Sequence, residues 1–202
     1  MFLVWARLVV SAVVFTAIMV QIAHLLQAGV FNSVNFFSYF TILSNVLAAS
    51  VFVVGAAYLA MRRKPSPEEE LVRGAAVLYM AVTGVVYVTL LSGYNVGLNL
   101  PWVNFILHYF MPVVVVLDWL YQPPRTKLTS KQTTVWLVFP VVYLAYSLIR
   151  GAFVGWYPYP FLDPGQGGYG KVALYTALIL IVFFVLGWLL TKFGNALKRN
   201  VV

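Results

Sequence analysis

The sequence predicts an all-α, polytopic membrane protein with six transmembrane helices, folded as a single domain over residues 1–202. Apolar side chains make up 62% of the chain and charged ones 9%, whereas a soluble domain is about half apolar and about a quarter charged. Six apolar stretches each reach the ~20 residues that a helix needs to cross a bilayer. These runs are continuous, which argues against the alternating pattern of a transmembrane β-barrel.

The predicted helices follow the apolar stretches in order. They cover residues 5–27, 37–61, 70–91, 102–121, 134–154 and 171–191. We expect the first to be a retained helix rather than a secretory signal, because no small-x-small cleavage site follows its apolar run of about 19 residues. The second begins within FFSYFTILSN, after an outward connection. The third follows Ser66-Pro67-Glu68-Glu69, which predicts a capping box with proline at the first helical position.

Turn-forming segments separate the remaining helices. SGYNVGLNLPW contains Gly, Asn and Pro and breaks the chain before the fourth helix. A basic stretch precedes the fifth helix, in which Pro140 is expected to make a packing bend. GWYPYPFLDPGQGGYG lies between the fifth and sixth helices, and its aromatic and turn-forming residues are typical of a segment at the level of the lipid headgroups.

The lysines and arginines divide unequally between the two sides of the predicted bundle. Eleven lie on one side: Arg7, Arg62, Arg63, Lys64, Arg73, Arg125, Lys127, Lys131, Lys192, Lys198 and Arg199. Only Arg150 and Lys171 lie toward the other side. The positive-inside rule therefore predicts that both termini are cytoplasmic, and we expect the protein in the cytoplasmic membrane of a bacterium.

Charge and composition exclude several classes of function. The net charge is +8, but the basic residues flank membrane helices, so they indicate anionic lipid headgroups and no nucleic-acid partner. Because the chain has no cysteine, it has no disulfide, no thiolate metal site and no cysteine nucleophile. With two histidines, and with Asp118 and Asp163 on opposite sides of the bilayer, no metal and no cofactor are predicted.

Polar residues interrupt the apolar helices in one layer near the outward surface. Thr41 lies about 7 Å and His108 about 10 Å below the points where their helices enter, at ~1.5 Å per residue. Ser38 and Asn45 are expected one turn on either side of Thr41, on the same helical face. His108 is too deep to reach water from the surface, so a functional role is favoured.

Other polar residues of the membrane have structural explanations. The hydroxyl of a residue such as Thr41 ordinarily bonds back to its own helix. His24 is most simply an interfacial histidine, and Arg150 reaches for the headgroups. Asp118 lies about 15 Å beyond His108, at the cytoplasmic end. There we expect an ion pair with the basic residues of the loops.

The neighbours of His108 along its helix predict a local distortion. Asn104 lies four residues earlier on the same face, where it could orient the imidazole by a hydrogen bond. Pro112 lies four residues later and cannot donate a hydrogen bond to the carbonyl of residue 108. We therefore expect a kink, with a cavity, at the histidine.

Three motifs resemble those of a known family when taken together. They are YFTILSN at the second helix, NFILHYFMP in the fourth, and WYPYPFLDP after the fifth. In this order and spacing the chain resembles the androgen-induced protein family of multi-pass membrane threonine hydrolases, along nearly its whole length. The family pattern differs at two places: Ser44 and Asn45 stand where animal members carry an acidic residue, and Asp163 stands where they tend to carry Glu.

The resemblance implies an intramembrane hydrolase of fatty acid esters of hydroxy fatty acids or similar acyl esters. It assigns Thr41 as the nucleophile and His108 as its partner. Histidine suits this role because its ordinary pKa is about 6.5, and a hydroxyl needs a base to take its proton as it attacks. Asn45, Ser38 and Arg150 are candidate donors to the oxyanion. The expected partners are membrane lipids and an acyl-ester substrate, with the site toward the extracytoplasmic side.

Two other functions are compatible with the sequence. His24 and His108 lie at comparable depth, as do paired histidines that ligate a b-type haem, so a haem- or lipid-binding protein without hydrolase activity is one alternative. A small-solute transporter is another, although the polar residues cluster in the outer third of the helices. The oligomeric state and the acyl-chain preference stay open.

Overall fold

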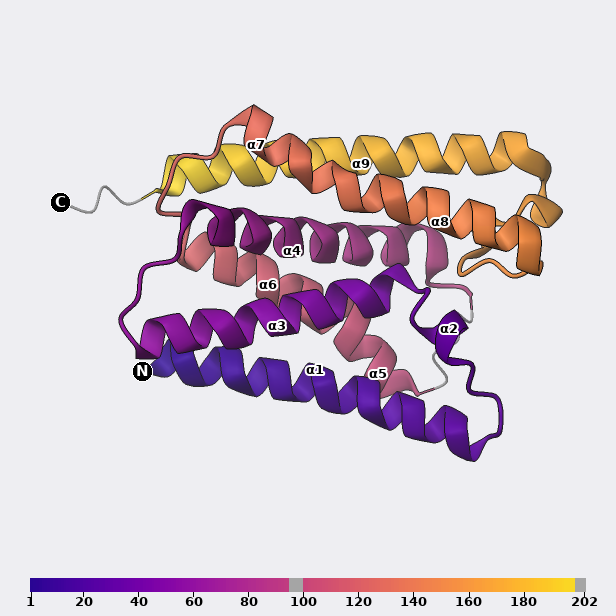
Figure 1. Ribbon diagram of the computed structural model, residues 1–202, viewed down its shortest axis with the longest axis horizontal. Helices are drawn as coiled ribbons and strands as arrows, with labels where there is room; N and C mark the ends of the chain where they lie inside the picture. The colour runs from indigo at the N-terminus through magenta and orange to yellow at the C-terminus, as the bar shows by residue number, and fades with distance from the viewer. Residues whose placement is uncertain (95–99, 199–202) are drawn as a thin grey trace.

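The computed structural model confirms the predicted all-α architecture, with six helices long and apolar enough to cross a membrane. It describes residues 1–94 and 100–198, so the centre of the SGYNVGLNLPW connection and Arg199 lie outside the described residues. The helices lie roughly side by side, and the first begins at the end of the bundle where the last one finishes (Figure 1). Which compartment faces that end remains a prediction.

The six long helices include several shorter elements. The first two are α1 (Phe2–Gln27) and α3 (Phe40–Ala60), and the short α2 (Ser33–Phe36) lies between them. The third is α4 (Pro67–Val86), continued by the π-helix η1 (Tyr87–Leu91). The fourth consists of α5 (Pro101–Phe105), the π-helix η2 (Ile106–Phe110) and α6 (Met111–Tyr121). The fifth consists of α7 (Ser130–Thr134), η3 (Val135–Leu137) and α8 (Val138–Val154), and the sixth is α9 (Gly168–Leu197), after the 3₁₀ turns η4 (Pro160–Leu162) and η5 (Pro164–Gln166).

Helix ends differ from the predicted ones where polar caps, rather than apolar runs, determine them. The capping box of Ser66 and Glu69 is present, so the third helix begins at Pro67 rather than at residue 70. A second capping box, from Thr129 and Gln132, starts the fifth helix at Ser130 rather than at residue 134. The first helix begins at Phe2, the second at Phe40 and the fourth at Pro101, and the sixth extends over Gly168–Leu197.

The central helix is α4, which packs against α3, α6 and α9. Of the six spans it is the most buried, whereas α8 and α9 are the least buried. Gly74 of α4 lies against the ring of Trp136, and the indole Nε1 of Trp136 donates to the carbonyl of Leu71 at 2.9 Å. The four helices α1, α3, α4 and α6 therefore surround the core, and α8 and α9 cover it from one side (Figure 1).

A buried ion cluster lies at the end of the bundle where α1 begins. Arg7 donates to both carboxylate oxygens of Asp118, each at 2.8 Å. Arg73 bonds Glu70 at 3.1 Å and lies 3.6 Å from Asp118. The expected ion pair of Asp118 is thus present, but its partners are helical arginines rather than loop residues. We call this the basic end, because the loops there carry Arg62, Arg63, Lys64, Arg125 and Lys127.

Candidate active site

Thr41 lies in the first turn of α3, at the end of the bundle opposite the ion cluster. Tyr39, which caps this helix, has an extended backbone, so α3 starts at Phe40 and its first turn leaves backbone N–H groups without helical partners. The N–H of Thr41 finds its partner in the hydroxyl of Tyr159, at 3.2 Å. Thr41 is buried. The hydroxyl of Thr41 therefore lies among protein groups rather than at the surface of the bundle.

His108 lies in the middle of the π-helical turn η2, where the sequence predicts a kink. Because Pro112 has no N–H, the α-helical bond to the carbonyl of His108 cannot form, and the wider π turn accommodates this loss. The carbonyl of Asn104 is 3.2 Å from the imidazole Nδ1. A carbonyl only accepts hydrogen bonds, so Nδ1 carries the proton and Nε2 presents a lone pair.

The structure brings the two predicted catalytic side chains together. Thr41 Oγ1 lies 3.3 Å from His108 Nε2. Since Nε2 is the acceptor, the threonine hydroxyl donates to it. Nucleophile and base in the resting state of hydrolases are often slightly further apart than an ideal hydrogen bond. The pair thus has the order expected of an activated nucleophile: hydroxyl, imidazole, and a group that orients the imidazole.

Tyr159, which precedes η4 in the loop after α8, completes this hydrogen-bond chain. Its hydroxyl lies 3.3 Å from Thr41 Oγ1 and accepts the backbone N–H of Thr41. Burial raises the pKa of Tyr159 to about 12, so the phenol keeps its proton and donates it to Thr41. The spacing of residues in the sequence does not predict this role of Tyr159. The only signal was the YPYPFL segment that contributes to the family resemblance.

Tyr87 and Asn104 fix the imidazole from the side. The ring of Tyr87 stacks on that of His108, with centroids 4.0 Å apart. The side-chain Nδ2 of Asn104 donates to the hydroxyl of Tyr87 at 2.6 Å. Asn104 therefore orients His108 as expected, but through its backbone carbonyl, while its side chain holds the stacked tyrosine.

Asn45 joins the two helices that carry the pair. Its Nδ2 donates to the carbonyl of Thr41 at 2.9 Å and to the carbonyl of Leu107 at 3.1 Å. One amide thereby fixes the height of α3 relative to η2. Asn45 acts here as a positioning residue. Its two amide protons are both used, which removes them from the candidate oxyanion donors.

Three other predicted residues lie apart from the pair. Ser38 precedes α3, in a turn rather than one helical turn above Thr41, and its hydroxyl contacts that of Tyr146 at 2.9 Å. Arg150 donates to the side chain of Asn35 at 2.6 Å and lies over the ring of Trp156. His24 lies in the last turn of α1, and no hydrogen bond within the described residues joins its side chain to the pair.

Two features beside the pair leave room for chemistry. An apolar cavity of about 80 Å³ is lined by Thr41, Tyr159 and side chains of α4, α8 and α9. His108 does not line it, so this cavity lies on the threonine side of the pair and not at the histidine, where the sequence predicts one. Several buried polar atoms have no hydrogen-bond partner within the described residues, among them both amide atoms of Gln21 and the hydroxyl of Ser44. Two of these atoms belong to the site: Oδ1 of Asn45, whose side chain bonds the carbonyl of Thr41, and Oγ1 of Thr176, which lines the cavity. Such atoms ordinarily bind water or a polar ligand.

Residues 1–94 and 100–198 contain no group of three or more His, Cys, Asp or Glu side chains that could hold a metal ion. Comparisons of the chain with protein-family models, with curated proteins and with solved structures gave no match. The resemblance to the androgen-induced protein family therefore stays a prediction, and the function is argued from the site itself.

Proposed function

We propose that the protein is an intramembrane lipid-ester hydrolase with Thr41 as the nucleophile and His108 as the general base. The observation that carries the proposal is the 3.3 Å separation of Thr41 Oγ1 and His108 Nε2, with the imidazole Nδ1 bonded to the carbonyl of Asn104. Acyl transfer needs this order of groups, because a hydroxyl attacks well only while a base removes its proton.

In the acylation step, Thr41 Oγ1 attacks the carbonyl carbon of the ester and its proton moves to His108 Nε2. The tetrahedral intermediate then expels the alcohol oxygen, which takes that proton from Nε2. An acyl-threonine and a free alcohol result. The phenol of Tyr159, 3.3 Å from Oγ1, is the candidate donor to the developing oxyanion.

In the deacylation step, a water molecule attacks the acyl-threonine and gives a proton to Nε2. When the second tetrahedral intermediate collapses, Nε2 returns this proton to Thr41 Oγ1 and a free carboxylic acid leaves. Water must therefore reach the buried pair. Asn45, which bonds the carbonyl of Thr41, and Thr176, which lines the cavity beside it, carry buried polar atoms without partners among the described residues, and these are suited to hold water close to the pair.

The walls of the cavity support a lipid substrate. Besides Thr41 and Tyr159, its lining is mainly apolar, including Phe40, Phe161 and Leu162. Its volume of about 80 Å³ is below the ~300 Å³ of a pocket that encloses a whole small-molecule ligand. Only the reacting part of a long ester fits inside. We expect fatty acid esters of hydroxy fatty acids, or similar acyl esters, whose chains extend into the surrounding lipid.

The test is hydrolysis of such an ester by the purified protein in detergent, together with labelling by a fluorophosphonate probe. Replacing Thr41 or His108 by Ala is expected to lower turnover at least about a thousand-fold, and Thr41→Ser should retain part of it. Thr83→Ala is the matched control, because Thr83 lines the same cavity but bonds the carbonyl of Tyr79. Turnover by Thr41→Ala at the wild-type rate would contradict the proposal.

A further inference from the structure

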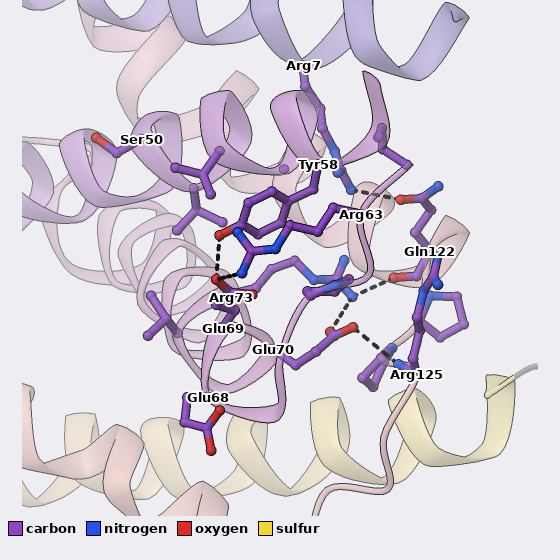
Figure 2. A pocket seen from close by; sticks show the side chains of 18 of the residues that line it. Arg7, Ser50, Tyr58, Arg63, Glu68, Glu69, Glu70, Arg73, Gln122 and Arg125 are labelled. Atoms are coloured by element: carbon purple, nitrogen blue, oxygen red, sulfur yellow. Dashed lines mark hydrogen bonds and ion pairs between the residues drawn. The ribbon is translucent and has the colours of Figure 1, made fainter. Parts of the chain in front are cut away.

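A second, larger cavity lies at the basic end, between α3, α4 and the segment after α6 (Figure 2). Its volume is about 700 Å³, within the range of ~300–1,000 Å³ typical of small-molecule sites. It shares no lining residue with the cavity beside Thr41. The hydrolase mechanism does not use it.

One wall of this cavity is apolar and belongs to α3. Leu47, Val51 and Val54 follow one another at intervals of three and four residues, so they form a stripe along one face of the helix. Val72 of α4 adds to the apolar lining. A stripe of this kind is complementary to a single acyl chain that lies along the helix.

The inner polar wall carries an available donor on Arg7. Arg7 uses Nε and Nη2 to bind Asp118, and Nη2 also bonds Gln122 at 3.1 Å. Its Nη1 makes no hydrogen bond within the part of the chain that the structure describes, although the side chain is only 6% exposed. Nη1 lies beside Gly55, where an added Cβ would approach it to 2.7 Å. The glycine thus leaves the donor open to the cavity.

The rim of the cavity is basic. Arg63 and Arg125 line it and are exposed, and Arg63 lies over the ring of Tyr58 and bonds Glu69 at 3.0 Å (Figure 2). The loops around the rim carry Arg62, Arg63, Lys64, Arg125 and Lys127 against Glu68 and Glu69. Deeper in the wall, Arg7 and Arg73 are balanced by Asp118 and Glu70. The excess positive charge therefore lies at the rim of the cavity.

We propose that this cavity binds an anionic phospholipid of the surrounding bilayer. The phosphate meets Arg63 and Arg125 at the rim, a glycerol ester carbonyl accepts from Arg7 Nη1, and one acyl chain lies along Leu47, Val51 and Val54. Basic pockets between membrane helices bind anionic headgroups in this way, and arginine is suited to phosphate because it offers a planar pair of donors. The proposal is independent of ester hydrolysis at Thr41.

The experiment measures thermal unfolding and native mass spectra of the detergent-purified protein with added phosphatidylglycerol or phosphatidylcholine. Phosphatidylglycerol is expected to raise Tm and to remain bound, whereas phosphatidylcholine does neither. Arg63→Gln should weaken phosphatidylglycerol binding about ten-fold, the effect of losing one charged hydrogen bond. Lys64→Gln, the matched control, removes the same charge from the same loop but does not line the cavity, and should bind normally.

A second variant tests the acyl-chain wall. Val54 is 45% exposed, so Val54→Trp should fold and yet obstruct the stripe, and the number of retained lipids should fall. Equal stabilisation by phosphatidylcholine, or equal weakening by Arg63→Gln and Lys64→Gln, would overturn the proposal. An equal rise in Tm with inorganic phosphate alone would assign the site to free phosphate instead.

Discussion

Asp118→Asn is expected to destabilise the protein strongly, because it removes one charge from a buried cluster while preserving shape. The carboxylate of Asp118 accepts two hydrogen bonds from Arg7, both at 2.8 Å, and lies 3.6 Å from Arg73. Its side chain is 7% exposed. An amide at this position would turn a donor toward a guanidinium that also only donates. Glu70 would be the remaining carboxylate for two buried arginines.

The magnitude follows from burial. Removing one partner of a buried ion pair costs about 3–5 kcal/mol, because the other charge stays desolvated. For a chain of this size each kcal/mol corresponds to about 2–4 °C in Tm, so the melting temperature should fall by about 6–20 °C. Nano-scale differential scanning fluorimetry in detergent, with the tryptophans as probes, measures this shift.

Arg63→Gln is the control for this prediction, because it breaks an ion pair at the surface. The side chains of Arg63 and Glu69 are 52% and 31% exposed. Such an exposed pair contributes little to stability, so in lipid-free detergent the variant should melt within a few degrees of the wild type. If Asp118→Asn and Arg63→Gln had the same Tm, the reasoning from burial would be refuted.

Two further predictions concern packing and alkaline pH. Gly74→Ala should lower the free energy of unfolding by about 1–3 kcal/mol through overpacking, because the added Cβ would overlap the buried ring of Trp136. Gly187→Ala is the control: its Cβ would meet a leucine at an ordinary 3.5 Å, so this variant should melt at the wild-type temperature. Tyr159 has its pKa raised by burial from 10.0 to about 12, so between these pH values its phenol ionises in the unfolded state first and stability falls as pH rises, by up to ~1.4 kcal/mol per unit. Tyr159→Phe should flatten this fall in Tm from pH 9 to 11.5, and an unchanged slope would argue against the burial of the phenol.

The helices could be predicted from sequence because each depends on local properties of the chain. A continuous apolar run of membrane-spanning length leaves the backbone no alternative to a helix. The capping box at Ser66 can be predicted for the same reason, because its two partners are only three residues apart in the sequence. The break before α3 was harder to predict. FFSYFTILSN contains no Gly or Pro that would break a helix, and its first residues leave the helix because α2 and an extended Tyr39 precede Phe40.

The depth of the site residues in the membrane could be predicted from the sequence, but the direction in which each side chain points could not. Counting residues from the helix ends places Thr41 and His108 in one layer, and in the structure their side chains point toward each other. Ser38 and Arg150, at similar depth, turn toward α8 and α2 instead. The path of a loop has no periodicity, so the return of Tyr159 to Thr41 could not be derived. Pro112 predicts the distortion at His108, but the contact of the Asn104 carbonyl with the imidazole Nδ1 depends on more than spacing.

The two least buried helices, α8 and α9, roof the cavity beside Thr41, while the pair itself is aligned by α3 and η2. Because α8 and α9 bury few side chains, they can move toward the bilayer while α3 and η2 keep their positions. The polar contacts that hold α8 beside α2 and the start of α3 include three hydrogen bonds: Tyr143 donates to the carbonyl of Ser38 at 2.8 Å, Tyr146 contacts the hydroxyl of Ser38 at 2.9 Å, and Arg150 donates to Asn35. These hydrogen bonds would have to break before α8 could move away from the cavity. If the protein has the proposed hydrolase function, breaking them would open a path for a lipid chain without disturbing the aligned hydroxyl and imidazole.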